Sequence, residues 1–169
     1  MDHSIVIQDL TKNKSVFQSL LSDVSDEFRL WRPSPEKWSL HEIVCHLLDE
    51  ERFDFRARVN HVLKTPGHPM PPIDPAGWVQ EKNYISWNYT ATLREFLLER
   101  ENSLKYLQEL VEPNWQLVHH HHKLGTISAG QLLYNWLAHD YLHFRQVTRY
   151  QYMFLKEQSG IDLGYAGDW

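Results

Sequence analysis

Two histidines one helical turn apart have the clearest chemical potential in this sequence. His139 and His143 are separated by four residues, so on a helix both imidazoles lie on one face and can bind one metal ion together. About 0.7 such pairs are expected by chance from eleven histidines in 169 positions, so spacing alone is weak evidence. Both residues, however, lie on an apolar stripe formed by Leu132, Trp136 and Val147, which predicts that they face a core.

A third histidine, His46, is expected on a different helix. It lies in the second turn after Ser39, beside Ile43 and Leu47 at the margin of an apolar stripe, so it can also project inward. Three neutral imidazoles with open coordination positions suit Zn²⁺, Ni²⁺ or another late first-row divalent ion, and an open site favours catalysis over a structural role. The sequence therefore predicts a metal site made of His46, His139 and His143.

Glu50 is the best candidate for a catalytic carboxylate near this site. It follows His46 by one turn and could be a general base, a further metal ligand or a hydrogen-bond partner of a ligand. Cys45 points about 100° away from His46 on a helix, which favours a packing role. Asp49 and Asp140 are expected to be solvated charges.

Four consecutive histidines, 119–122, precede the turn Leu124-Gly125-Thr126. We expect them to form a solvated loop outside the metal site, although such a run also binds transition metals adventitiously. They are internal, so they are not a terminal tag.

Four amphipathic segments separated by breakers must position these residues. Apolar residues at three- and four-residue spacing predict helices over about 8–27, 39–64, 88–110 and 126–159. The segment 65–77 contains five prolines and two glycines, which predicts a long crossover loop without regular structure. No segment alternates with a period of two for long enough to predict a strand. The sequence thus indicates a single all-α domain, a four-helix bundle.

Composition and charge exclude several classes of function. Seventeen basic and 22 acidic residues give a formal charge of −5, so the chain has no general attraction to nucleic acid or to anionic membranes. The common glycine-rich phosphate loops are absent, and the single Cys45 cannot form an internal disulfide. The N-terminus lacks the pattern of a signal peptide, and no apolar run is long enough to span a bilayer, so a cytoplasmic protein is expected.

Three parts of the sequence resemble DinB-like proteins, the DinB/YfiT-like superfamily. The segment 31–47 (WRPSPEKWSLHEIVCHL) resembles the entry to the second helix of that family, with its Trp-Ser pair, acidic residue and following histidine in order. Gly125-Thr126 and the sequence HDYLH at 139–143, followed by Gln146, are similar to the second metal motif. The resemblance covers essentially the whole chain.

The resemblance implies a fold and a function. It implies an up-down-down-up bundle in which His46, His139 and His143 bind a divalent ion such as nickel or zinc, in a chain that forms a homodimer. Better-understood members act on small electrophiles with low-molecular-weight thiols such as bacillithiol or mycothiol. In that case the metal would lower the pKa of the thiol, and Glu50 or a metal-bound hydroxide would take its proton.

Three alternatives stay open at this point. The same ion could activate water, which would make the protein a metal-dependent hydrolase. The ion could instead stabilise a non-catalytic bundle that binds a ligand or partner. In the simplest case, the histidines merely pack in a bundle without metal.

Overall fold

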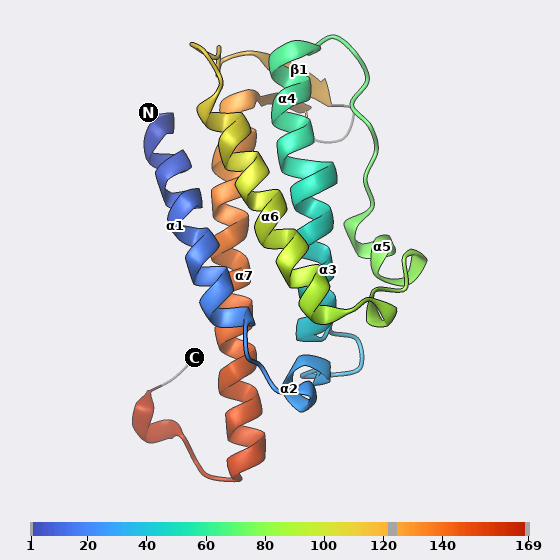
Figure 1. The fold of residues 1–169 in the computed structure, drawn as a ribbon, viewed down its shortest axis with the longest axis vertical. Helices are drawn as coiled ribbons and strands as arrows, with labels where there is room; N and C mark the ends of the chain where they lie inside the picture. The colour runs from blue at the N-terminus through green and yellow to red at the C-terminus, as the bar shows by residue number, and fades with distance from the viewer. Residues whose placement is uncertain (1, 122–124, 168–169) are drawn as a thin grey trace.

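Four long helices form the body of the computed structural model, which describes residues 2–121 and 125–167 (Figure 1). In the view of Figure 1 the first runs downward, the second and third run upward, and the fourth runs downward again, which confirms the up-down-down-up bundle. The second is one continuous rod that includes a π-helical turn. In chain order the four are α1 (His3–Leu21), the rod α3 (Leu40–Asp49), η1 (Glu50–Phe55) and α4 (Arg56–Lys64), then α6 (Tyr89–Gln108) and α7 (Ala129–Ser159).

Two capping boxes fix where the helices that carry the site histidines begin. The Ser39 hydroxyl accepts from the amide of Glu42, and the Glu42 carboxylate accepts from the amide of Ser39. Ser128 and Gln131 repeat this arrangement at the start of α7. Both pairs satisfy amides that the first helical turn leaves without partners.

The first predicted helix is in fact two helices. A single helix over 8–27 was expected, but α1 ends at Leu21 and a separate α2 (Asp26–Leu30) follows. Asp23 adopts a left-handed conformation with φ 55°, which stops α1, and the Ser25 side chain then caps α2. Periodicity missed this break because Phe28 on α2 packs into the same core as the apolar face of α1.

The crossover between the second and third long helices contains a short helix that the sequence analysis missed. The segment 65–77 was expected to lack regular structure, yet α5 (Pro75–Glu81) begins inside it. Asp74 caps the amide of Gly77, and Pro75 lies in the first turn, where a proline has no intrahelical donor to lose. A short η2 (Tyr84–Ser86) leads into α6, and η3 (Gly164–Ala166) follows α7.

A β-hairpin precedes α7, so the prediction of no strand was wrong. β1 (Val118–His121) pairs antiparallel with β2 (Gly125–Ser128), and His119 lies opposite Ile127. Strands of four residues are too short to give a period of two, and their stability comes from backbone pairing that the sequence does not display. The histidines 119–121 are therefore strand residues and not a solvated loop, and His122 lies outside the described residues.

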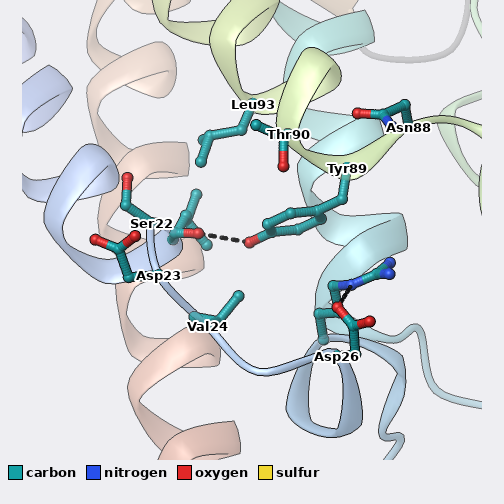
Figure 2. A pocket seen from close by; sticks show the side chains of 10 residues that line it. Ser22, Asp23, Val24, Asp26, Asn88, Tyr89, Thr90 and Leu93 are labelled. Carbon is teal, nitrogen blue, oxygen red and sulfur yellow. Dashed lines mark hydrogen bonds and ion pairs between the residues drawn. The ribbon is translucent and has the colours of Figure 1, made fainter.

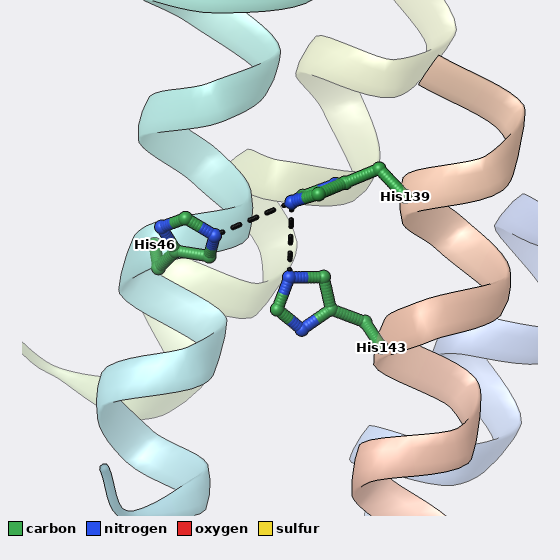
Figure 3. A group of neighbouring side chains, drawn as sticks. All are labelled: His46, His139 and His143. Carbon is green, nitrogen blue, oxygen red and sulfur yellow. Dashed lines mark hydrogen bonds between the residues drawn. The ribbon is translucent and has the colours of Figure 1, made fainter. Parts of the chain in front are cut away.

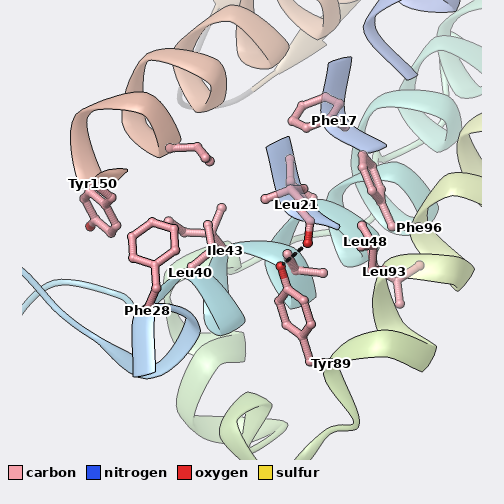
Figure 4. Packing of buried hydrophobic residues seen from close by; sticks show 13 residues of the cluster. Phe17, Leu21, Phe28, Leu40, Ile43, Leu48, Tyr89, Leu93, Phe96 and Tyr150 are labelled. Carbon is pink, nitrogen blue, oxygen red and sulfur yellow. Dashed lines mark hydrogen bonds between the residues drawn. The ribbon is translucent and has the colours of Figure 1, made fainter. Parts of the chain in front are cut away.

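Two apolar clusters share the interior, and a belt of polar residues lies between them. The lower cluster in Figure 1, drawn in Figure 4, includes Phe17, Leu48 and Phe96, and the upper one includes Leu10, Phe55 and Leu104. Each long helix contributes one buried polar residue to the belt between these clusters, namely Asn13, Glu51, Arg100 and Asp140. Among the described residues, no helix is long and apolar enough to cross a membrane.

Candidate metal centre

The side chains of His46, His139 and His143 meet between two helices (Figure 3). His46 comes from α3, and the other two come from α7. The Nε2 atom of His139 lies 3.4 Å from Nε2 of His46 and 3.0 Å from Nε2 of His143. Three ring nitrogens therefore converge on one point, which is the arrangement the sequence predicted. In the described part of the chain, no other three metal-binding side chains come this close together.

Burial keeps all three imidazoles neutral. Desolvation lowers the pKa of His46 to about 3, of His139 to about 2 and of His143 to about 4. A neutral imidazole offers a lone pair, which is the form that binds a metal. Each converging Nε2 atom can therefore act as a ligand at neutral pH.

The distances between the nitrogens fit a divalent ion. Two nitrogens bound to one tetrahedral Zn²⁺ at about 2.05 Å are about 3.3 Å apart, close to the separations seen here. The opposite ring nitrogens, Nδ1 of His46 and of His143, are buried and have no hydrogen-bond partner. If these two nitrogens carry the ring protons, Nε2 is left with its lone pair pointing to the common centre. The donor set is therefore suited to a metal, although binding itself stays a prediction.

Glu50 lies on the outer side of His46. Its Oε1 atom is 4.0 Å from Nδ1 of His46 and has no hydrogen-bond partner. Burial raises the pKa of Glu50 well above its usual value, and the neighbouring Asp54 raises it further, so the pair holds one proton at neutral pH. Arg58, which pairs with Asp54, favours one ionised carboxylate in the pair. The π-helical turn η1 begins at Glu50, and such turns often occur at functional sites. Its predicted catalytic role is compatible with this position and stays a prediction.

Asp49 and Asp140 are buried, so the expectation that they are solvated was wrong. Asp49 accepts hydrogen bonds from the Tyr84 hydroxyl at 2.6 Å and from Lys82 Nζ at 2.7 Å. Asp140 is fully buried and accepts two hydrogen bonds from Arg100 at 2.7 and 2.8 Å. Both carboxylates lie on inward helix faces, where a buried charge must be paired. They support the helices and do not point to solvent.

Arg100 is a buried residue near the site that the sequence analysis missed. It connects α6 to two other helices, because its Nε atom also donates to Glu51 at 3.0 Å. Trp136 donates to the same carboxylate at 3.2 Å. One signal could have revealed it: Arg100 lies four residues from both Phe96 and Leu104 on the apolar face of α6.

Aromatic side chains enclose the trio. The ring of Trp38 lies 4.9 Å from that of His46, and the ring of Phe55 lies 5.0 Å from that of His139. Cys45 is buried and its thiol contacts the carbonyl oxygen of Tyr84 at 3.6 Å, which confirms that it packs away from the trio. Burial raises the pKa of the Cys45 thiol to about 12, so it stays protonated.

Two other places could be confused with this centre. A pocket at the α1–α2 connection and the start of α6, drawn in Figure 2, contains Asp23, Asp26 and Tyr89 but no histidine. The hairpin and the end of α4 bring a second group of histidines together. The ring of His119 lies 5.3 Å from that of His61, and Nδ1 of His119 contacts the carbonyl oxygen of Pro66 at 2.9 Å. Neither place shares a residue with the trio.

We expect the metal-free protein to lose stability as the pH falls from 7 to 5. The three histidines have folded pKa values below the unfolded value of about 6.5, so the unfolded chain binds more protons and unfolding is favoured below that pH. The raised pKa of Glu50 acts in the opposite direction, because the folded state then holds the extra proton. The net loss is on the order of 3 kcal/mol, measurable by denaturant unfolding at each pH. Equal stability at pH 7 and 5 would contradict it.

Comparison with known proteins gives a family and a fold. The DinB superfamily matches residues 9–147. The solved structure of YfiT from Bacillus subtilis superposes with a TM-score of 0.78 over 95% of this chain and 89% of its own, at 16% sequence identity. YfiT is described as a probable metal-dependent hydrolase with an unusual four-helix bundle topology. None of the curated proteins matches the chain.

Proposed function

Because the chain belongs to the DinB superfamily, we propose that it is a metal-dependent enzyme whose divalent ion, Zn²⁺ or Ni²⁺, is bound by His46, His139 and His143. The convergence of three neutral Nε2 atoms, two of them on buried histidines, supports this proposal. Three protein ligands leave coordination positions open for a substrate, which is typical of catalytic and not of structural sites.

The reaction we propose is transfer of a low-molecular-weight thiol, such as bacillithiol, to a small electrophile. A bound divalent ion would supply a Lewis acid that lowers the pKa of the thiol. Glu50 is the proposed proton acceptor: the Glu50–Asp54 pair holds one proton between two carboxyl groups and can take a second, and the Oε1 atom of Glu50 has no partner and borders His46. The rings of Trp38 and Phe55 pack against His46 and His139 and give the centre apolar neighbours. The resemblance to thiol-using members of the family supports this choice.

Hydrolysis is the second candidate, and one observation favours it. YfiT, which shares this fold, is described as a probable metal-dependent hydrolase. In this case a water molecule replaces the thiol as the nucleophile, and the same residues would bind the ion and accept the proton. The two candidates therefore differ only in whether turnover requires a thiol.

Turnover of a model electrophile in the presence and absence of thiol tests the proposal. Metal-loaded protein is given 1-chloro-2,4-dinitrobenzene with bacillithiol in one assay, and 4-nitrophenyl acetate without thiol in another. We expect thiol-dependent release of chloride that disappears after chelation and returns with Zn²⁺ or Ni²⁺. Ester hydrolysis alone would favour the hydrolase, and no turnover in either assay at full metal content would leave a non-catalytic bundle.

The Glu50→Gln variant separates two roles for this residue in the same assays. Glutamine retains an oxygen that can accept a hydrogen bond from Nδ1 of His46 but cannot take a proton. If Glu50 is the proton acceptor, kcat should fall about 10²-fold or more while the metal content stays unchanged. A variant with normal kcat would show that Glu50 only orients His46.

A further inference from the structure

A pocket lined by basic side chains lies beside the candidate metal centre. It has a volume of about 610 Å³ and lies between α7 and the loop that precedes α3. Its lining includes Lys37 from the loop and Arg145 and Arg149 from α7. No acidic residue lines it.

The three cations of this pocket form no ion pairs within the described part of the chain, although the carboxylate of Glu36 acts on the adjacent Lys37. Among the described residues, no carboxylate forms an ion pair with Lys37, Arg145 or Arg149, whereas the neighbouring Arg32 is paired with Glu42 at 2.7 Å. The chain as a whole carries a formal charge of −5, so three unpaired cations around one pocket contrast with the rest of the molecule. Such a pocket attracts anions.

The α7 wall of the pocket adjoins the histidine trio. Gln146 lines the pocket and follows His143 by three residues, about 4.5 Å along the helix axis. Gln146 follows His139 by seven residues, which is a rotation of only about 20° from two full turns, so the two side chains share one face of α7. The pocket therefore continues the face of α7 from which the metal ligands project.

The opposite wall adjoins the trio as well. Lys37 directly precedes Trp38, whose ring lies 4.9 Å from that of His46. Between the walls, neutral groups could bind the body of a small molecule: the Gln146 amide contacts the Tyr150 hydroxyl at 3.4 Å, and Met153 adds an apolar side chain. A pocket with three cations whose two walls adjoin the histidine trio fits a small organic molecule with a charged group at one end.

We propose that the substrate bound at the histidine trio carries a carboxylate or phosphate group, which Arg145, Arg149 and Lys37 hold in this pocket. Arginine suits either group, because its guanidinium donates two parallel hydrogen bonds to carboxylate or phosphate oxygens. The inference rests on the proposed function, since the trio is taken as the reacting end. It makes Arg145 and Arg149 binding residues that select an anionic substrate over a neutral one.

Calorimetric titration at low ionic strength tests this pocket with two probes. Succinate and inorganic phosphate are titrated separately into the metal-loaded protein, so that the two sources of negative charge are distinguished. The double variant Arg145→Gln/Arg149→Gln is compared with a matched control, Lys64→Gln/Arg94→Gln, which removes two exposed charges outside the pocket. We expect Kd for the preferred anion to rise at least about tenfold in the first variant and less than about twofold in the control.

Two results would overturn the inference. One is the absence of saturable binding of either probe to the unsubstituted protein. The other is a rise in Kd for the anion that is equally large in both double variants. Metal content, measured on the same samples, reports separately on the proposed function. A protein that binds metal but shows no arginine-dependent anion binding contradicts only the pocket, whereas one that binds the anion but no metal contradicts only the metal centre.

Discussion

Replacing His143 with alanine is expected to abolish stoichiometric metal binding. Its Nε2 atom lies 3.0 Å from that of His139, so removing the ring takes away one of three converging ligands. The loss of one imidazole from such a site should weaken affinity on the order of a hundredfold or more. Mass spectrometry of untagged, chelator-washed and metal-reconstituted protein should find about one ion per chain before the substitution and almost none after it.

The hairpin histidines provide the control for this measurement. Replacing His119, His120 and His121 together should leave the stoichiometric ion in place, because they lie on the hairpin and the converging ligand group consists of His46, His139 and His143. If the ion is lost when the hairpin histidines are replaced but is retained in His143→Ala, the proposed centre is contradicted. Thermal unfolding gives a second readout: metal at 1,000 times its Kd should stabilise the unsubstituted protein by about 4 kcal/mol and should not stabilise His143→Ala comparably.

Much of this fold follows from local signals in the sequence. The capping boxes at Ser39 and Ser128 fixed two helix starts, and the apolar periodicity predicted the long helices that carry the trio. Local signals failed where backbone geometry decides the structure. The left-handed Asp23 that divides the first helix and the four-residue strands of the hairpin have no periodic signature.

In the candidate site, too, local signals predict some residues and miss others. His46, His139 and His143 could be predicted because each lies on an inward helix face, although 93 residues separate His46 from its first neighbour on α7. The burial of Asp49 and Asp140 could not be predicted from their residue type, because acidic residues are usually solvated. Their partners, Lys82 for one and Arg100 for the other, are distant in sequence, so only the packing of helices reveals the pairs.

Replacing Arg100 with leucine is expected to destabilise the protein by about 3–5 kcal/mol. The guanidinium is only 2% exposed and pairs with Glu51 and Asp140, so its removal leaves two buried carboxylates without their cation. Denaturant unfolding measures the loss. Arg94→Leu, on an exposed face of the same helix, is the matched control and should change stability by less than about 0.5 kcal/mol. A similar, small effect of both substitutions would contradict a structural role for the buried network.

The triple variant Arg100→Leu/Glu51→Leu/Asp140→Leu tests whether this network also serves the metal centre. Without the buried charges, much of the lost stability should return, because apolar replacement of a buried ion network is often neutral or favourable. Metal affinity should nevertheless stay lower than in the unsubstituted protein. The network has two carboxylates against one guanidinium, and the negative charge of Asp140 acts on His143, which favours a dication nearby. Affinity that recovers together with stability would show that the network only holds the helices together.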